Sequence, residues 1–146
     1  MRGERVRPAG QVWMRCRRGL LASSLLAAHV ALFAGSATAQ VSWVGTTSND
    51  WTDGTNWSSG AVPPAGTVVN IDTISPNPTV LGVGGAAAGT TAAFNVGSIA
   101  GATGHLIIQS GSTLTSTDLT RIGIAPGSTG IVTVTGQGSQ WNIATP

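Results

Sequence analysis

The chain has 146 residues, a formal net charge of +2, seven arginines, no lysine and one cysteine, Cys16. Six arginines lie within the first 18 residues, so from Gln40 onward one arginine, Arg121, stands against four aspartates, a net charge of −3. This distribution excludes a basic stripe for phosphate backbones, and we expect no nucleic-acid partner. A single cysteine also excludes a disulfide within the chain.

Residues 1–39 have the pattern of a secretory signal peptide. A basic segment precedes an apolar stretch from Gly19 to about Gly35, and Ala37-Thr38-Ala39 is a small-residue cleavage site. We predict a signal-peptide helix, cleavage between Ala39 and Gln40, and export of the remaining chain. A membrane anchor is the alternative, and polar residues within the apolar stretch argue against it. General and twin-arginine export both stay open.

Residues 40–80 are predicted to form a tryptophan-rich N-terminal cap. Trp43, Trp51 and Trp57 lie within fifteen positions and are separated by the turn formers Asn, Asp, Gly and Ser. The first coil of a stacked array exposes an apolar end, and each Trp buries on the order of 200 Å². The three tryptophans are therefore expected to cover that end. Sugar binding by exposed Trp rings is the alternative interpretation.

Residues 96–146 contain an internal repeat. Val96 to Ser110 matches Ile122 to Gly136 at an offset of 26 positions, a period typical of stacked repeat folds. Apolar and polar residues alternate within each copy, which indicates strands. We predict an all-β fold, a parallel β-helix (β-solenoid) fragment of about two coils. The Gly/Ala-rich residues 81–95 are predicted to be a bridge or a poorly formed first rung.

The repeat also predicts the solenoid core. Leu106 should lie over Val132, Ile108 over Val134, and Leu114 over Trp141 after one inserted residue, all in a dry interior. The predicted strands are Val68–Asp72, Ala92–Val96, Leu106–Ser110, Leu114–Ser116, Ile131–Thr135 and Gln140–Ile143.

No catalytic set is found in the part that follows the signal peptide. His105 has no matching nucleophile and acid, so a surface position beside a turn is expected. Asp50, Asp53 and Asp72 could form a carboxylate pair, but the first two lie among turn residues. Residues 49–56 resemble a calcium loop, with a tryptophan at the second ligand position and no closing glutamate. We expect no enzyme, no cofactor and no metal.

Two motifs carry a family resemblance. Trp43 through Pro63, W-x-G-x-x-S-x-D-W-x-x-x-x-N-W-S-x-G-x-x-P, resembles the start of bacterial autotransporter passenger domains. Ile122 through Trp141, I-G-x-x-P-G-S-T-G-x-V-T-V-T-G-x-G-S-x-W, is similar to the repeat of type V secretion passengers and some PEP-CTERM surface proteins. The resemblance implies a surface-displayed parallel β-helix and a β-barrel translocator downstream. The chain ends at Pro146 without barrel strands, so we expect the N-terminal piece of a longer protein.

The function expected from these observations is that of an exported cell-surface passenger fragment. It would be a structural or adhesive β-solenoid with no catalytic activity of its own, at the surface or outer membrane of a Gram-negative bacterium or outside the cell. Its partner would be a host or cell-surface glycan or protein. The alternative is a polysaccharide-binding or polysaccharide-active β-helix protein, a fold-level analogy.

Overall fold

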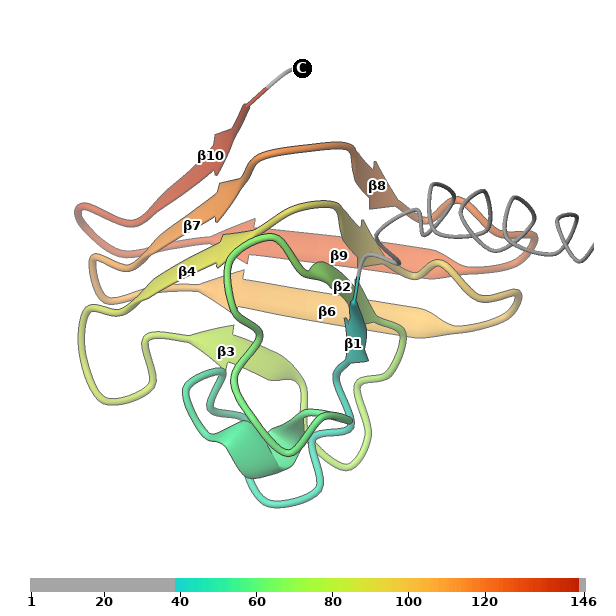
Figure 1. The fold of residues 1–146 in the computed structure, drawn as a ribbon, viewed down its shortest axis with the longest axis horizontal. Coiled ribbons are helices and arrows are strands. Elements are labelled where there is room, and N and C mark those ends of the chain that lie inside the picture. Colours follow the sequence, from blue (N-terminus) through green and yellow to red (C-terminus); the bar gives the residue numbers. More distant parts are fainter. Residues whose placement is uncertain (1–38, 145–146) are drawn as a thin grey trace, which may run out of the picture. The chain divides into compact units, whose positions relative to one another are not determined.

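The structure is a computed structural model that describes residues 39–144. Within this range the chain forms ten β-strands and one short 3-10 helix, η2 (Gly54–Asn56). The strands make three sheets in which every pairing is parallel (Figure 1). The all-β, parallel β-solenoid prediction is thereby confirmed. The predicted signal-peptide helix lies outside the described residues.

The chain winds through the three sheets in rotation, one strand in each sheet per coil. Sheet 1 has the strand order β1-β2-β5-β8, sheet 2 has β3-β6-β9, and sheet 3 has β4-β7-β10. We number the coils 1 (β1 and the irregular residues after it), 2 (β2–β4), 3 (β5–β7) and 4 (β8–β10). The strand bounds are β1 (Gln40–Ser42), β2 (Val68–Ile71), β3 (Thr79–Leu81), β4 (Ala88–Thr91), β5 (Phe94–Val96), β6 (Thr103–Ile108), β7 (Thr113–Ser116), β8 (Thr120–Ile122), β9 (Thr129–Val134) and β10 (Gln140–Ile143).

The register between coils 3 and 4 is the one that the repeat predicts. In sheet 2, Leu106 pairs with Val132 and Ile108 with Val134. In sheet 3, Leu114 pairs with Trp141 in spite of the inserted residue. Because side chains alternate between the two faces of a strand, a slip of one residue would turn each apolar side chain outward. The period of the sequence therefore fixes the register.

The two coils predicted for residues 96–146 are present as coils 3 and 4, but the stack as a whole has about four, because the chain before them also contributes strands. Residues 81–95, predicted to be a bridge or a poorly formed first rung, belong to the coils: they include β4 and most of β5, which pair in register with coil 3 and with β2. The alternation is hidden there because Gly89 and Thr91 occupy the inward positions of β4. A Cβ at Gly89 would contact the side chains of Leu114 and Trp51, so Trp51 fills the space that the glycine leaves.

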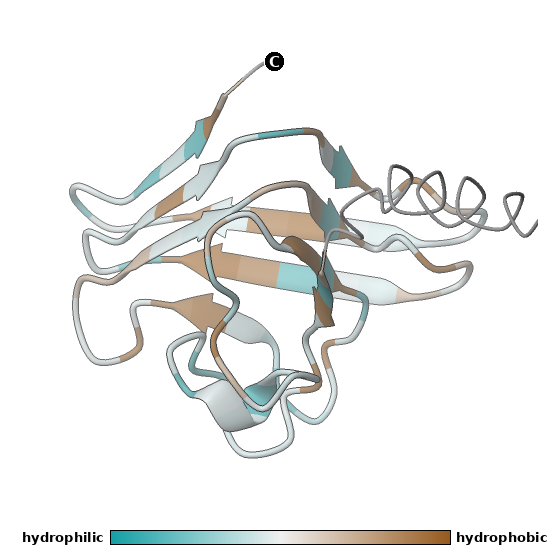
Figure 2. Cartoon of the chain, in the orientation of Figure 1, coloured by the Kyte–Doolittle hydropathy of each residue, from teal (hydrophilic) through white to brown (hydrophobic). Residues whose placement is uncertain are grey.

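One continuous apolar core runs through coils 1 to 3. Figure 2 shows hydrophobic residues along β3 and the second half of β6. Full burial of such a side chain contributes about 1.5–3 kcal/mol. The buried aliphatic and phenylalanine side chains of this core are Val41, Val69, Ile71, Leu81, Phe94, Val96, Leu106, Ile108 and Leu114.

Coil 4 departs from the predicted dry interior. Val134 and Ile122 are each 45% exposed, and Val132 and Trp141 are only partly buried. Their register partners in coil 3 are fully buried. The physical reason is the absence, among residues 39–144, of any strand paired with the far edges of β8, β9 and β10. The prediction of a dry environment was therefore wrong for Val134.

Candidate interaction surface

The tryptophan segment, residues 43–67, places its three indole rings in the core. Trp43, Trp51 and Trp57 are all buried. The ring centroid of Trp57 lies 5.0 Å from that of Trp43 and 4.7 Å from that of Trp51, both edge to face. The Trp57 Nε1 donates to the Trp51 carbonyl at 2.8 Å. Sugar stacking needs an exposed ring face, and none of these three rings offers one.

A buried amide organises the loop between these tryptophans. The Asn56 Oδ1 accepts hydrogen bonds from the backbone N–H groups of Thr47 and Ser48, each at 2.9 Å. Its Nδ2 donates to the Ser48 Oγ at 2.8 Å and to the Asp50 carbonyl at 3.1 Å. Sequence reasoning missed Asn56, although it stands within the N-W-S part of the first motif. Four hydrogen bonds to one side chain fix the loop's conformation.

The same segment pairs with the near edge of coil 2. The Trp51 N–H donates to the Val80 carbonyl at 2.9 Å, and the Val80 N–H donates to the Asn49 carbonyl at 2.8 Å. In sheet 1, β1 pairs with β2. Trp51 also reaches the interior, where its ring centroid lies 6.2 Å from that of Phe94. At this end of the stack, two sheet edges and the interior are occupied.

The carboxylates serve local turns. The Asp50 Oδ1 accepts from the N–H and Oγ1 of Thr52, both at 2.8 Å. The Asp53 Oδ1 accepts from the Oγ1 of Thr55 at 2.6 Å and from its N–H at 3.0 Å. The hydroxyl of Thr55, then its N–H, and more weakly the hydroxyl of Ser48, lower the pKa of Asp53.

The remaining titratable candidates form hydrogen bonds between neighbouring coils. The Asp72 carboxylate accepts hydrogen bonds from the N–H and hydroxyl of Ser98 and from the N–H of Ile99. The His105 Nε2 lies 3.2 Å from the Thr133 Oγ1. Within residues 39–144, no three side chains of His, Cys, Asp or Glu are grouped closely enough to hold a metal ion. The structure brings none of these residues into a common site.

The outer face of sheet 3 carries two ladders of small, uncharged side chains. Their members are exposed or half-buried, and the strand register stacks them one per coil. Five of the six members carry a hydroxyl or amide group that both donates and accepts hydrogen bonds, and these groups are spaced by the interstrand distance of about 4.8 Å; the sixth member, Ala88, is apolar. We name this surface the polar ladder face; it consists of Ala88, Thr113 and Gln140 in one ladder and Thr90, Thr115 and Asn142 in the other.

Sequence reasoning did not find the polar ladder face. Its outward positions recur at offsets of 25 residues from β4 to β7 and 27 residues from β7 to β10. The first offset was hidden because the strand at β4 was not predicted. The T-x-T of Thr113 to Thr115 and the Q-x-N of Gln140 to Asn142 were the available signal.

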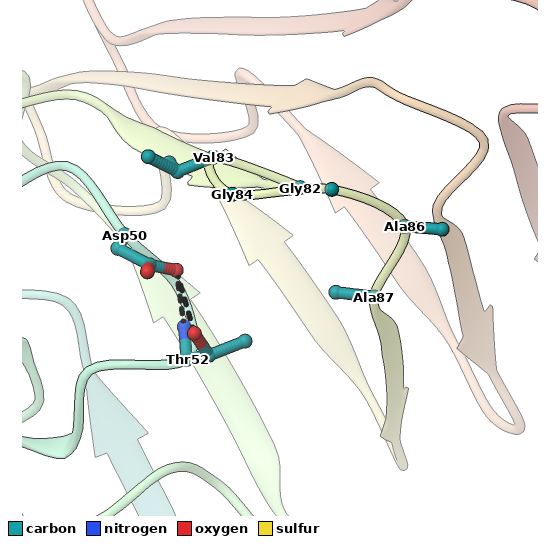
Figure 3. Close-up of a pocket in the computed structure, with 8 residues that line it drawn as sticks. Asp50, Thr52, Gly82, Val83, Gly84, Ala86 and Ala87 are labelled. Carbon is teal, nitrogen blue, oxygen red and sulfur yellow. Dashed lines mark hydrogen bonds between the residues drawn. The ribbon is translucent and has the colours of Figure 1, made fainter.

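A shallow pocket of about 230 Å³ lies between the tryptophan segment and the loop after β3. Asp50, Thr52 and residues 82–87 line it, and Figure 3 shows the Asp50 carboxylate hydrogen-bonded to Thr52. The loop contributes mainly glycine and alanine, which bring backbone groups and few functional side chains. The pocket therefore offers less binding chemistry than the polar ladder face.

Comparison of the chain with protein-family models, with curated proteins and with solved structures found no match. Within the described residues, no helix has the length and apolar character needed to cross a lipid bilayer.

Proposed function

We propose that the chain is an exported structural module of the cell surface, a β-solenoid that presents a polar face for contact and has no catalytic activity of its own. The observation that carries the proposal is the stack itself: about four coils in register, with a regular array of uncharged hydroxyl and amide groups along the outside of sheet 3. A repeated face suits repeated, weak contacts better than it suits a single reaction centre.

The coil-to-coil contacts support a mechanical role. Coils 2, 3 and 4 share backbone hydrogen bonds in three sheets, and the inward side chains of coils 1 to 3 fill a continuous core. In such an array each coil is held by its neighbours along the axis. The result is a stiff rod-like element, which fits a part that projects from a surface.

The N-terminal geometry supports export and capping. Ala39 and Gln40 are exposed, and Gln40 is the first residue of β1, so cleavage between them would leave that strand whole. The tryptophan segment pairs with coil 2 and fills the interior beside it. We therefore assign this segment as the N-terminal cap. This is the order of parts expected of an autotransporter-like passenger, whose β-barrel translocator would be encoded downstream.

A neutral glycan or an uncharged protein surface is the partner that this face suits. Thr, Gln and Asn side chains can donate and accept hydrogen bonds without the desolvation penalty of a charge. The same observation favours the second candidate, a polysaccharide-binding β-helix protein. Polysaccharide cleavage would need a pair of positioned carboxylates. Of the aspartates that were considered for such a pair, Asp50 and Asp53 each bind a local turn, and Asp72 accepts hydrogen bonds from Ser98 in the next coil.

Export is tested by expressing the full chain in a Gram-negative host and determining the N-terminal sequence of the product. The expected result is a product that begins at Gln40 and is recovered outside the cytoplasm. A precursor that keeps residues 1–39 and stays in the cytoplasm would contradict the export proposal.

Contact through the polar ladder face is tested with glycan arrays and two matched variants. Thr115→Glu places a charge in the middle of that face, and Thr103→Glu places the same charge on the outer face of sheet 2, where Thr103 is also half-buried. We expect Thr115→Glu to weaken binding and Thr103→Glu to leave it unchanged. Equal effects would remove the assignment to sheet 3, and absence of binding to any glycan would favour the purely structural role.

A further inference from the structure

We infer that Gln40 is a modification site, at which the N-terminal glutamine released by signal cleavage closes into a pyroglutamate ring. The inference rests on the proposed cleavage between Ala39 and Gln40, and it adds a chemical step that this proposal does not contain. Cleavage would convert the backbone N–H of Gln40 into an α-amine. That amine and the side-chain amide of the same residue are the two groups that react.

The pairing of β1 leaves the backbone nitrogen of Gln40 outside the ladder to β2. In a parallel pair, alternate residues of a strand direct their backbone groups toward a given neighbour. The Val68 N–H donates to the Ala39 carbonyl at 2.9 Å. Just after β1, the Trp43 N–H donates to the Asn70 carbonyl at 2.9 Å. Gln40 therefore directs its nitrogen away from β2, and ring closure at this nitrogen breaks no hydrogen bond between the two strands.

The side chain of Gln40 is placed to reach this nitrogen. Gln40 is exposed, whereas its neighbour Val41 is 6% exposed and belongs to the core. Because successive side chains of a strand point to opposite faces, the Gln40 side chain lies on the outer face of sheet 1. Its amide group can therefore turn back toward the nitrogen without leaving a buried position.

Ring closure is balanced by the loss of ammonia and needs no further reactant. The lone pair of the uncharged α-amine attacks the side-chain carbonyl carbon, Cδ. A bond forms between the amine nitrogen and Cδ, the bond between Cδ and Nε2 breaks, and Nε2 leaves as ammonia with the proton that the amine gives up. An ordinary α-amine titrates just above neutral pH, so a part of it is uncharged at neutral pH. Attack within one residue also avoids the entropic cost of bringing two molecules together.

The ring would protect the strand that covers coil 2. β1 has three residues, and its middle residue, Val41, pairs with Val69 in the core. Exposed chain ends are preferred sites of proteolysis, and an aminopeptidase that removed two residues would take Val41 away. Signal cleavage also removes the Ala39 carbonyl that accepts from Val68, so β1 is held by fewer hydrogen bonds. A pyroglutamate ring has neither the free amine nor the terminal charge that such an enzyme binds.

Mass spectrometry of the exported product tests the inference. The full chain is expressed in a Gram-negative host, and the product is kept folded at neutral pH until its mass is constant. We expect a mass below that of residues 40–146 by one molecule of ammonia, with the loss located at residue 40. Gln40→Asn is the matched control, because it keeps an amide and the residue before the cleavage site but would need a four-membered ring. It should keep its full mass.

The failure of this inference is distinguishable from the failure of the export proposal. A product that begins at Gln40 and retains its ammonia would overturn the ring while leaving export intact. A product that keeps residues 1–39 would overturn both. Loss of ammonia that occurs in urea but not in the folded product would show that the fold holds one of the two reacting groups, and it would also overturn the inference.

Treatment with a broad-specificity aminopeptidase measures the protection of β1. The wild-type product should stay intact, whereas Gln40→Asn should lose residue 40 and then Val41. Thermal melts after the treatment should then show a lower midpoint for the variant, because Val41 no longer covers Val69. Equal trimming of the two products would contradict a blocked N-terminus.

Discussion

Coils 3 and 4 are two copies of one repeat that differ in burial. Leu106 and Ile108 are fully buried, whereas their partners Val132 and Val134 are half-buried and 45% exposed. The two copies share their pattern of apolar and polar positions, so the pattern alone does not decide burial. In a linear stack, burial requires a neighbour on each side, and coil 3 has two neighbours among the described residues where coil 4 has one.

The opposite end of the stack shows how the same problem is met by an irregular segment. Coil 2 also lacks a regular neighbour on one side, yet its inward residues Val69, Ile71 and Leu81 are fully buried. On this side Val41 of β1 pairs with Val69, and the tryptophan segment adds three large aromatic side chains to the same core. One short strand and three large aromatic rings therefore help to bury coil 2 on one side, whereas coil 4 has no such cover beyond it among the described residues.

The first way to test the comparison is to remove side chains at equivalent positions. Leu106→Ala should lower the free energy of unfolding by about 2–5 kcal/mol, because it leaves a cavity between two coils. Val132→Ala should cost less than about 1 kcal/mol, since its side chain already contacts water and loses little burial. Urea denaturation followed by circular dichroism measures both.

Equal losses for Leu106→Ala and Val132→Ala would show that coil 4 is covered in solution. Such a result would contradict the comparison, because the difference in burial between coils 3 and 4 would then have no effect on the free energy of unfolding.

The second test adds a methyl group where two coils approach most closely. A Cβ at Gly104 would overlap the carbonyl oxygen of Ile71, and a Cβ at Gly130 would overlap that of Val96. Gly104→Ala should destabilise by about 1–3 kcal/mol. Gly130→Ala should cost less, because coil 4 can move outward while coil 3 is held on both sides. Thermal melts of the two variants decide the order, and a larger effect at Gly130 would contradict it.

Most strands of coils 3 and 4 were predictable because their apolar residues alternate visibly and repeat at a fixed offset, although β8 was not among the predicted strands. In coil 2, β2 was predicted but β4 was not, because Gly89 occupies an inward position of β4 and a tryptophan 38 positions earlier fills the space. When a side chain so distant in the sequence fills an inward position, the local pattern of apolar residues no longer shows the strand. The sheet order of β1 and β3 was hidden for the same reason, since the segment between them is irregular.

The polar ladder face and the exposure of coil 4 depend on information that a local pattern does not contain. The ladder through Thr90, Thr115 and Asn142 exists because three strands stack in register. The exposure of Val134 depends on which coils are present beyond it. The spacing of Trp43, Trp51 and Trp57 marks them as a group in the sequence, but the edge-to-face packing of Trp57 against the other two depends on the loop that Asn56 fixes.

The smallest expected effect concerns pH and distinguishes the tryptophan end from coil 4. The hydrogen bonds from Thr55 hold the pKa of Asp53 below its ordinary value. The folded chain therefore binds this proton less readily than the unfolded chain, whose Asp pKa is about 3.9. The stabilisation is complete above that value and is lost as the pH falls through the lower folded value. Acid should loosen the tryptophan segment first.

Asp53→Asn isolates this contribution, because asparagine keeps a side-chain oxygen that can accept from Thr55 and removes the titrating group. Tryptophan fluorescence reports the packing of Trp43, Trp51 and Trp57, and circular dichroism reports the coils. Below about pH 4, the wild-type fluorescence should change more than that of the variant, while the two circular dichroism signals stay parallel. Identical fluorescence curves would assign the acid sensitivity to another carboxylate. A simultaneous loss of both signals would show instead that the tryptophan segment and the coils unfold as one unit. The tryptophan end and coil 4 would then differ in burial but not in stability to acid.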